Sequence, residues 1–242
     1  MTFLRLLSSA TDLLWPPRCA ACDAPIRHAG VDAERAAFCE ACSSSLVRAA
    51  SPRCPRCGLS FDAGGSDHLC GRCLAEPPPF ESLAARYAYG GALSDAITRF
   101  KYGPAPWLAA PLARLLAEGF APAGPPDLVV PVPLHPRRLR ARGFNQAALL
   151  ASRLPRAVGA PLDTAILRRE VDTPHQAGLT AARRQDALAG VFRARPCGRL
   201  RGARVLLVDD VATTTATVRS AAAALVAAGS GAVSVLCLAR TM

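Results

Sequence analysis

The sequence predicts an α/β protein in which a small cysteine-rich module precedes a parallel sheet covered by helices. Apolar runs typical of buried strands alternate with helical segments through the second part of the chain, as in doubly wound folds. Eight of the ten cysteines form four Cys-x-x-Cys pairs before residue 74. Hydrophobic residues make up 51% of the 242 residues, which excludes a disordered chain and suffices for one sizeable core.

The first residues, MTFLRLLSSATDLLWPP, have an apolar character that could indicate an export signal. We interpret them instead as a short amphipathic helix that ends before Pro16. Ser8, Ser9 and Asp12 interrupt the apolar run, and no strongly basic segment precedes it. The sequence also lacks an uncharged apolar window of about 18 residues, the length that a membrane span needs. These features predict a cytoplasmic protein without a membrane span.

The cysteine spacing predicts two structural zinc sites. Sixteen residues separate the first two pairs and twelve separate the last two, close to zinc ribbons in which two Cys-x-x-Cys turns supply four thiolates. We favour sequential pairing of the turns over a cross-brace, and zinc over an iron–sulfur cluster or disulfides. A four-thiolate site has no open coordination position, so we expect it to fold the chain and not to catalyse. The predicted ligands are Cys19, Cys22, Cys39 and Cys42 for one ion, and Cys54, Cys57, Cys70 and Cys73 for the other.

The boundary between the two parts falls near LAEPPPFES, residues 74–82, because three successive prolines cannot continue a helix or a central strand. We expect a zinc-binding module over residues 1–76 and a second domain over residues 83–242. The net charge of +11 lies entirely after residue 80, since acidic and basic residues cancel before it. This excess indicates an anionic partner, a polyphosphate or nucleic acid, or reflects only an arginine-rich composition.

The expected elements of the second part begin with a helix-rich entry from Leu83. The run ARVLLVDDV is near-continuously apolar, as in a parallel strand covered on both faces. Gly229 is a plausible end for the helix that follows this strand. Ligands of such sheets bind at the carboxyl ends of the strands. We expect helices over residues 92–102, 107–120, 143–154 and 215–229, and strands over residues 127–133, 162–169, 203–211 and 232–240.

The run VLLVDDVATTTATV, residues 205–218, places two adjacent carboxylates and a threonine cluster where a buried strand ends. A nucleoside triphosphatase would need a GxxxxGK[ST] loop, which this sequence lacks. A phosphoacceptor receiver domain would need more chain than the 32 residues that follow Asp210. The run fits a ribose-phosphate site, where carboxylates accept hydrogen bonds from vicinal hydroxyls and the loop and helix N-terminus bind phosphate.

This run resembles the signature with which type I phosphoribosyltransferases bind 5-phosphoribosyl-1-pyrophosphate (PRPP). Together with the cysteine-rich front end, the segments FKY (100–102), VPVPLHPRRLRARGFNQA (130–147) and QAGLTAARR (176–184) are similar to the ComF family of competence proteins. The resemblance implies a type I phosphoribosyltransferase-like parallel sheet with an N-terminal double zinc-ribbon module. It also implies a phosphoribosyltransferase that displaces pyrophosphate from PRPP with an unknown acceptor, in connection with DNA uptake.

The resemblance also implies roles for particular residues. Asp209 and Asp210 would bind the ribose hydroxyls at the catalytic centre, and Mg²⁺ would be held largely by pyrophosphate and ribose oxygens. Residues 170–184 occupy the place of the mobile loop that closes over substrate. The residues expected to bind PRPP are Val211, Ala212, Thr213, Thr214, Thr215, Ala216 and Thr217 around the 5-phosphate, and Pro133, Leu134, His135 and Arg137, with Arg138 nearby, around the pyrophosphate.

Two positions depart from the family pattern. Thr215 stands where the signature has a small residue, usually glycine, and its Cβ restricts the backbone and crowds a phosphate. Thr2 stands where glutamine-dependent amidophosphoribosyltransferases expose a cysteine, so we do not expect glutamine amidotransferase activity. The alternatives are a non-catalytic DNA-processing competence factor and a PRPP-responsive regulator on the same fold. The expected partners are PRPP and, for the DNA-processing alternative, single-stranded DNA and other competence proteins.

Overall fold

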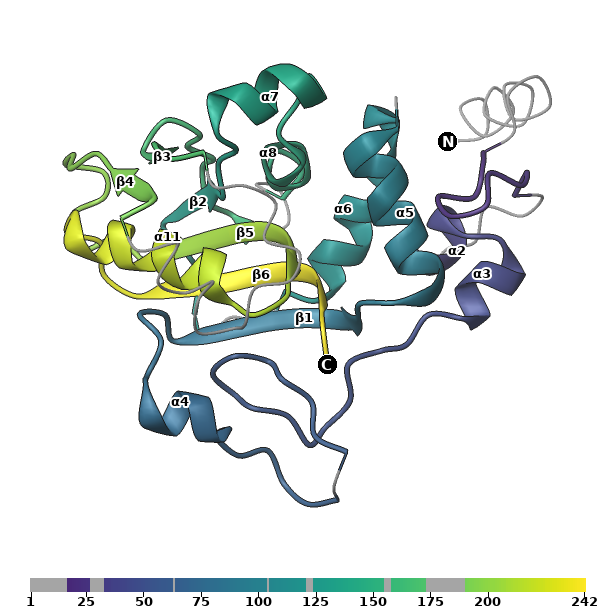
Figure 1. Ribbon diagram of the computed structural model, residues 1–242, viewed down its shortest axis with the longest axis horizontal. Coiled ribbons are helices and arrows are strands. Elements are labelled where there is room, and N and C mark those ends of the chain that lie inside the picture. Colours follow the sequence, from purple (N-terminus) through teal and green to yellow (C-terminus); the bar gives the residue numbers. More distant parts are fainter. Residues whose placement is uncertain are drawn as a thin grey trace.

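The computed structural model describes residues 17–26, 33–62, 64–103, 105–120, 124–154, 158–172 and 190–242 (Figure 1). Within these ranges a four-stranded parallel sheet lies at the centre of the molecule. Its strands follow the order β1 (Ser82–Ala88), β6 (Val233–Arg240), β5 (Val205–Ala212) and β2 (Leu128–Pro131). An isolated parallel bridge between Val129 and Leu162 continues the sheet beyond β2.

The two central strands are buried on both faces, as their apolar sequences predict. Every residue of β5 except Val211 is buried, and in β6 only Ser234 is partly exposed. The two strands pair in parallel register from Val205 opposite Val233 to Ala212 opposite Arg240. This register sets the carboxyl ends of β5 and β6 side by side at one edge of the sheet.

Helices cover both faces of the sheet (Figure 1). On one face, Leu112 and Leu150 belong to a buried cluster that includes Val208 of β5. On the other face, Leu225 packs in a second cluster with Leu207 of β5. Alternate residues of one strand therefore enter two separate cores, as a doubly wound sheet requires. The first face is covered by α5 (Gly91–Tyr102), α6 (Ala109–Glu118) and α8 (Gln146–Ala151), and the second by α11 (Ala216–Ala227).

Two segments differ from the sequence prediction. Residues 82–88, assigned to a helix-rich entry, form the edge strand β1, in which Leu83, Ala85 and Tyr87 are buried and alternate with partly exposed residues. The short alanine-rich run conceals this period of two. Residues 162–169 were expected to form one strand of the sheet. Instead Leu162 makes a single bridge, and β3 (Leu167–Arg169) pairs with β4 (Phe192–Ala194) in a separate antiparallel ribbon.

The described part of the cysteine-rich module contributes three short helices, and Figure 1 shows α2 and α3 beside α5 and α4 below β1. The segment that joins α3 to the second cysteine cluster covers part of the edge of β1. Ala49 N donates to Arg86 O, and Ala88 N donates to Val47 O, both at 2.8 Å. Such cover protects an edge strand from pairing with another chain. The helices are α2 (Ala33–Ala37), α3 (Glu40–Ser44) and α4 (Gly71–Ala75).

The helix expected before Pro16 lies outside the described residues. Among the helices that the structure does describe, none is long and apolar enough to cross a membrane.

Candidate functional site

Asp209 and Asp210 lie in the last half of β5, toward the carboxyl edge of the sheet, where parallel α/β sheets bind their ligands. Only 7% and 3% of their surfaces are exposed. Asp210 N donates to Asp209 Oδ1 at 2.9 Å, and Val211 N donates to Asp210 Oδ1 at 2.8 Å. One oxygen of each carboxyl group is thereby fixed by the backbone.

Lys101, near the end of α5, completes this acidic centre. Its Nζ lies 2.8 Å from Asp210 Oδ2. Burial raises the pKa of Asp209 to about 8, and the charge of Asp210 adds to the rise while Lys101 opposes it. Burial alone would lower the pKa of Lys101, but the adjacent carboxylates outweigh burial and raise that pKa. The centre therefore pairs Lys101 with Asp210 beside a second carboxyl group, Asp209, whose protonated form burial favours.

The loop between β5 and α11, residues 213–215, turns through a left-handed residue. Thr215 has φ 62° and ψ −1°, and Asp23 is the one other non-glycine residue in the described ranges with positive φ. A β-branched side chain is strained in this region, which glycine adopts without cost. Thr215, which stands where the family pattern has glycine, therefore has a backbone conformation that favours glycine.

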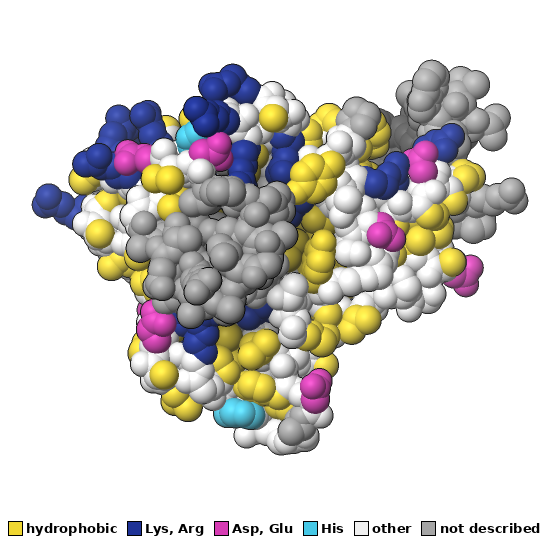
Figure 2. All heavy atoms as spheres, viewed as in Figure 1, with side chains coloured by type: hydrophobic (Ala, Val, Ile, Leu, Met, Phe, Trp, Pro, Cys, Tyr) yellow, Lys and Arg dark blue, Asp and Glu magenta, His cyan; other side chains and the backbone are white. Residues whose placement is uncertain are grey.

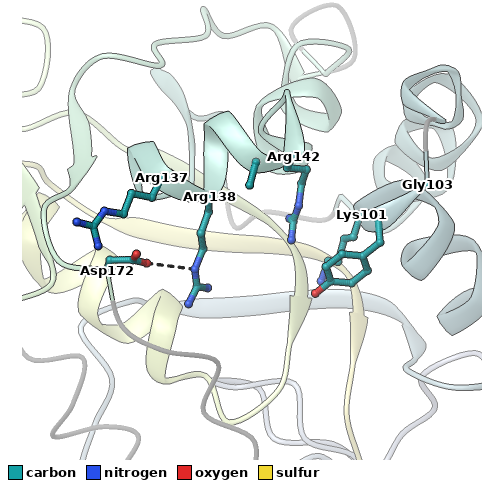
Figure 3. Close-up of a pocket in the computed structure, with 8 residues that line it drawn as sticks. Lys101, Gly103, Arg137, Arg138, Arg142 and Asp172 are labelled. Carbon is teal, nitrogen blue, oxygen red and sulfur yellow. Dashed lines mark ion pairs between the residues drawn. The ribbon is translucent and has the colours of Figure 1, made fainter.

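A cavity of about 700 Å³ adjoins the acidic centre through Lys101. Figure 3 shows the three arginines of α7 extending away from their helix, with Arg142 toward Lys101 of α5, and Arg137 and Arg138 on the side of Asp172. Asp172 is the one acidic residue among the described lining residues, and its Oδ1 lies 3.4 Å from Arg138 Nε. The cavity is therefore strongly cationic and suits a polyanion. Its lining residues are Lys101, Tyr102, Gly103, Arg137, Arg138, Ala141, Arg142 and Asp172.

The segment after β2 starts beside the acidic pair, because Val132 N donates to Val208 O at 2.9 Å. Pro133, Leu134 and His135 follow, and α7 (Pro136–Arg142) begins directly after them. The predicted pyrophosphate segment and the acidic pair therefore lie at the same edge of the sheet.

His135 has a structural role at the start of α7. Its Nδ1 accepts a hydrogen bond from Arg137 N at 3.3 Å and lies 3.7 Å from Asp172 Oδ2. Residues 173–184 of the expected mobile loop lie outside the described residues.

Sequence reasoning missed several residues of this site. Lys101 is the only lysine among 29 lysines and arginines and lies in the FKY segment that resembles the ComF family, but no role in the site was predicted for it. No PRPP-binding role was predicted for Arg142 or Tyr102, although the guanidinium carbon of Arg142 lies 5.0 Å from the centroid of the Tyr102 ring. Arg72 and Arg240 bond carbonyls of the loop after β5 from 142 and 27 residues away in sequence, so no local pattern reveals them.

The eight paired cysteines form two clusters of four, grouped in sequential order. Within each cluster all sulfurs lie within 4.8 Å of one another, with Cys22 and Cys39 sulfurs 3.7 Å apart and Cys57 and Cys70 sulfurs 3.6 Å apart. Zn–S bonds of about 2.3 Å in a tetrahedron place sulfurs about 3.8 Å apart, so both clusters fit zinc. Sequential pairing is confirmed, and the cross-brace is excluded.

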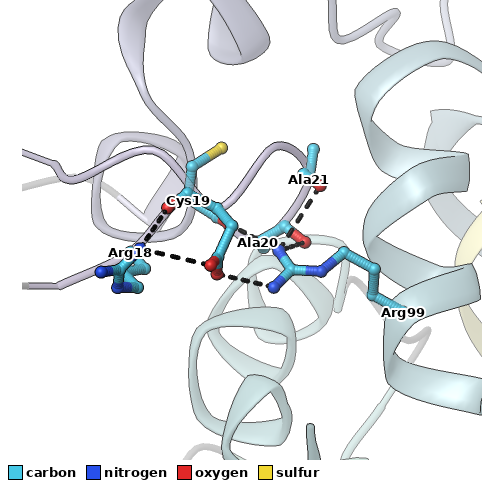
Figure 4. Close-up of polar contacts among 6 residues, drawn as sticks. Arg18, Cys19, Ala20, Ala21 and Arg99 are labelled. Atoms are coloured by element: carbon cyan, nitrogen blue, oxygen red, sulfur yellow. Dashed lines mark hydrogen bonds and ion pairs between the residues drawn. The ribbon is translucent and has the colours of Figure 1, made fainter. Parts of the chain in front are cut away.

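The first cysteine cluster contacts the helix that carries Lys101. Figure 4 shows the Arg99 guanidinium facing the turn of Cys19. It donates to the carbonyls of Cys19 and Ala20 at 2.9 Å and of Ala21 at 3.4 Å, and it pairs with Asp23 at 2.6 Å. Helix α5 therefore contacts this turn mainly through the backbone carbonyls of the turn.

Comparison with known proteins agrees with this geometry. A family model described as a double zinc ribbon domain matches residues 10–74. DNA utilization protein YhgH of Escherichia coli K12 is 36% identical over 211 residues, 85% of this chain and 91% of the relative. The chain belongs to the ComF family of competence proteins. Other ComF relatives are Competence protein F of Haemophilus influenzae, 33% identical over 74% of this chain and 80% of the relative, and Competence protein ComFC of Bacillus subtilis, 27% identical over 80% of each.

Two solved structures are similar to part of this ComF chain. One is the allosteric regulatory enzyme of purine biosynthesis, with a TM-score of 0.40, 21% identity and coverage of 58% of this chain. The other is the glutamine PRPP amidotransferase from B. subtilis, with a TM-score of 0.39, 22% identity and 57% coverage. This chain spans 30% of each of those proteins.

The predicted architecture of this ComF protein is confirmed: a parallel α/β sheet with an N-terminal double zinc ribbon.

Proposed function

We propose that this ComF protein binds PRPP with Mg²⁺ and transfers the phosphoribosyl group to an acceptor, releasing pyrophosphate. The observation that carries the proposal is the buried acidic pair at the end of β5, followed directly by a loop and a helix N-terminus. Among the described residues, no acceptor receives the amides of Thr213, Thr214 and Thr215. PRPP carries vicinal hydroxyls, which carboxylates can bind, and a phosphate, which loop amides and a helix N-terminus can bind.

The acidic centre binds the ribose and favours charge development at its anomeric carbon. Lys101 lies 2.8 Å from Asp210 Oδ2, and Asp210 accepts hydrogen bonds from the ribose hydroxyls, together with Asp209. The Asp210 carboxylate beside the ring also stabilises the positive charge that the ring gains as pyrophosphate leaves. Mg²⁺, when bound, would offset the charge of the leaving pyrophosphate.

The two anionic ends of PRPP bind to different parts of the site. The 5-phosphate binds the loop amides, the first amides of α11 and the hydroxyls of Thr213, Thr214 and Thr217. The pyrophosphate binds beside the segment after β2, where Arg137 and Arg138 face the cavity (Figure 3). These arginines neutralise the leaving group, which lowers the free energy of the transition state.

Substitution of Asp210 tests the proposal. Asp210→Asn removes the charged acceptor, and a charge-assisted hydrogen bond contributes about 1.5–3 kcal/mol, so PRPP affinity should fall about 10- to 100-fold. Asp127→Asn is the matched control, because Asp127 is exposed at the opposite end of the sheet. Calorimetry with PRPP and Mg²⁺ measures affinity. Pyrophosphate release across a panel of acceptors, including single-stranded DNA, then identifies the acceptor. Equal PRPP affinity of wild type and Asp210→Asn would refute the ribose assignment.

A second candidate function is nucleic-acid binding without turnover. Arg137, Arg138, Arg140 and Arg142 all lie on α7, and Figure 2 shows Lys and Arg side chains gathered over that helix. Tyr102 beside them is 63% exposed and offers a ring on which bases could stack. The printed names of the relatives refer to DNA utilization and competence. This candidate leads if PRPP does not bind.

We also propose that each cysteine cluster binds one structural Zn²⁺. The closed four-sulfur geometry supports this role, since it has no open ligand position. The proposed division of the chain stays at residues 1–76 for the zinc module and 83–242 for the phosphoribosyltransferase-like domain.

A further inference from the structure

The second zinc module, residues 54–73 with helix α4, contacts the loop after β5 directly. Arg72 lies between Cys70 and Cys73 and is half-buried. Its Nη1 donates to Thr214 O at 2.8 Å. A residue placed by two cysteines of one cluster therefore holds a carbonyl of the loop that we propose to bind the 5-phosphate.

Arg240, at the end of β6, holds the same loop and the same module. Its Nη1 donates to Ala212 O at 3.2 Å and to Thr213 O, while its Nε donates to Cys57 O at 3.2 Å. Arg240 is only 8% exposed, so these bonds are sheltered from water. Together with Arg72, it holds three successive carbonyls of the loop.

The helix that follows the loop is attached to the end of α4 as well. Arg219 of α11 is 5% exposed. Its Nη2 donates to Glu76 O at 2.8 Å, and its Nη1 lies 3.5 Å from Glu76 Oε1. Loop and helix therefore contact the module as one unit.

These carbonyl contacts determine which way the loop amides point. A trans peptide unit is planar, and its C=O and N–H point in opposite directions. Because the carbonyls of Ala212, Thr213 and Thr214 face the arginines, the amides of the next residues face the other side. There they adjoin the first amides of α11, and successive amides of this kind form an anion-binding concavity.

We infer that the second zinc module is part of the phosphate site, with Arg72 and Arg240 as positioning residues that orient the loop amides toward the 5-phosphate. This inference rests on the proposed function. It has a reciprocal consequence: if the metal-folded module favours phosphate binding, then bound PRPP favours the metal-folded module by the same factor.

Arg56 provides a matched control for Arg72. It belongs to the same module, lies between Cys54 and Cys57, and is also half-buried. Its Nη1 donates to Phe80 O at 3.1 Å, in the segment before β1 and not in the phosphate loop. If these arginines served only to attach the module, the two substitutions would have equal effects.

The test compares Arg72→Gln and Arg56→Gln in the full-length, zinc-loaded protein. Loss of one charge-assisted bond should weaken PRPP binding about tenfold in Arg72→Gln, and less than about twofold in Arg56→Gln. The PRPP affinity of Arg72→Lys, which keeps a cation, should lie between the affinities of wild type and Arg72→Gln. Inorganic pyrophosphate, which needs only the α7 side of the site, should bind all variants equally. Zinc content should stay at two per chain.

Two readouts do not depend on catalysis. Nitrogen-15 relaxation of the ligand-free protein should show order parameters of the amides 213–217 falling from about 0.85 toward 0.6 in Arg72→Gln only. Saturating PRPP should slow the release of one zinc ion to a zinc-selective chelator in wild type, and do so less in Arg72→Gln.

The relaxation data also separate the two proposals. If wild type fails to bind PRPP, the proposed function is wrong, while ordered amides that loosen only in Arg72→Gln still support positioning. Equal affinity and equal relaxation in Arg72→Gln and Arg56→Gln would overturn the inference.

Discussion

Thr215 has a left-handed backbone conformation, so glycine should stabilise the protein more than alanine at this position, the reverse of their usual order. In this conformation, φ 62° and ψ −1°, a residue with a Cβ is strained by about 1–2 kcal/mol. Thr215→Ala keeps the Cβ and therefore most of the strain, and it loses buried side-chain atoms worth about 1 kcal/mol. Thr215→Gly loses the same atoms and about 0.5–1 kcal/mol of backbone entropy, but it relieves the strain. Glycine should therefore be more stable than alanine here, by about 1 kcal/mol.

The control is Thr217, which lies inside α11. There alanine should be more stable than glycine by up to ~1 kcal/mol, because alanine has the higher helix propensity. Urea unfolding of the zinc-loaded variants gives the four free energies of unfolding. If alanine is as stable as glycine at position 215, the left-handed conformation is wrong.

The same variant tests the phosphate loop. Because glycine removes a Cβ next to the proposed phosphate, Thr215→Gly should bind PRPP at least as tightly as wild type in calorimetry. If wild type does not bind PRPP and Thr215→Gly does, this chain has lost its substrate site. The non-catalytic DNA-processing function would then be the better proposal.

Three further predictions concern metal, pH and nucleic acid. Elemental analysis should find two zinc ions per chain and one in Cys57→Ser; one or none in wild type with reduced thiols would contradict the four-thiolate sites. The folded state raises the pKa of Asp209 from about 4 to about 8, so its neutral form is favoured on folding. This contribution to stability is complete below about pH 4 and is lost as pH rises toward 8. The urea midpoint of Asp209→Asn should therefore depend less on pH between 5 and 8 than the midpoint of wild type. An equal dependence on pH in both proteins would contradict the raised pKa of Asp209. The affinity for single-stranded DNA should fall steeply as salt concentration rises, and it should fall less steeply in the double variant Arg137→Gln/Arg140→Gln. If the wild type does not bind single-stranded DNA at ~50 mM salt, a direct contact is excluded.

Sequence patterns predicted the parts of the structure that depend on local order. The apolar run before Asp209 fixes a buried strand, and the Cys-x-x-Cys spacing fixes both clusters, because each follows from neighbouring residues. β1 was missed because its alternation of small residues is weak and its strand character comes from pairing with β6. The ion pair between Lys101 and Asp210 was also missed, because it joins residues from different elements. Such long-range contacts depend on the packing of α5 against the sheet, which no single segment specifies.

The loop after β5 and the first turns of α11, residues 213–225, show that long-range contacts of the site were also not predictable from sequence. Its helix and its threonines were predictable, and the strain at Thr215 followed from comparison with a glycine pattern. The arginines that hold its carbonyls were not, since Arg72 and Arg240 are ordinary members of an arginine-rich chain until the fold brings them together.

The contacts of Arg99 have a consequence for how the zinc module is attached to α5. Arg99 bonds three backbone carbonyls of the first cysteine turn, and its one side-chain partner there is Asp23. Carbonyl positions depend on the turn that the four sulfurs impose, and hardly on which side chains the turn carries. The small size of Ala20 and Ala21, which are buried against the core, lets the Arg99 guanidinium reach these carbonyls. The attachment of this module to α5 therefore depends mainly on the four cysteines that shape the turn and on one arginine 80 residues away in sequence.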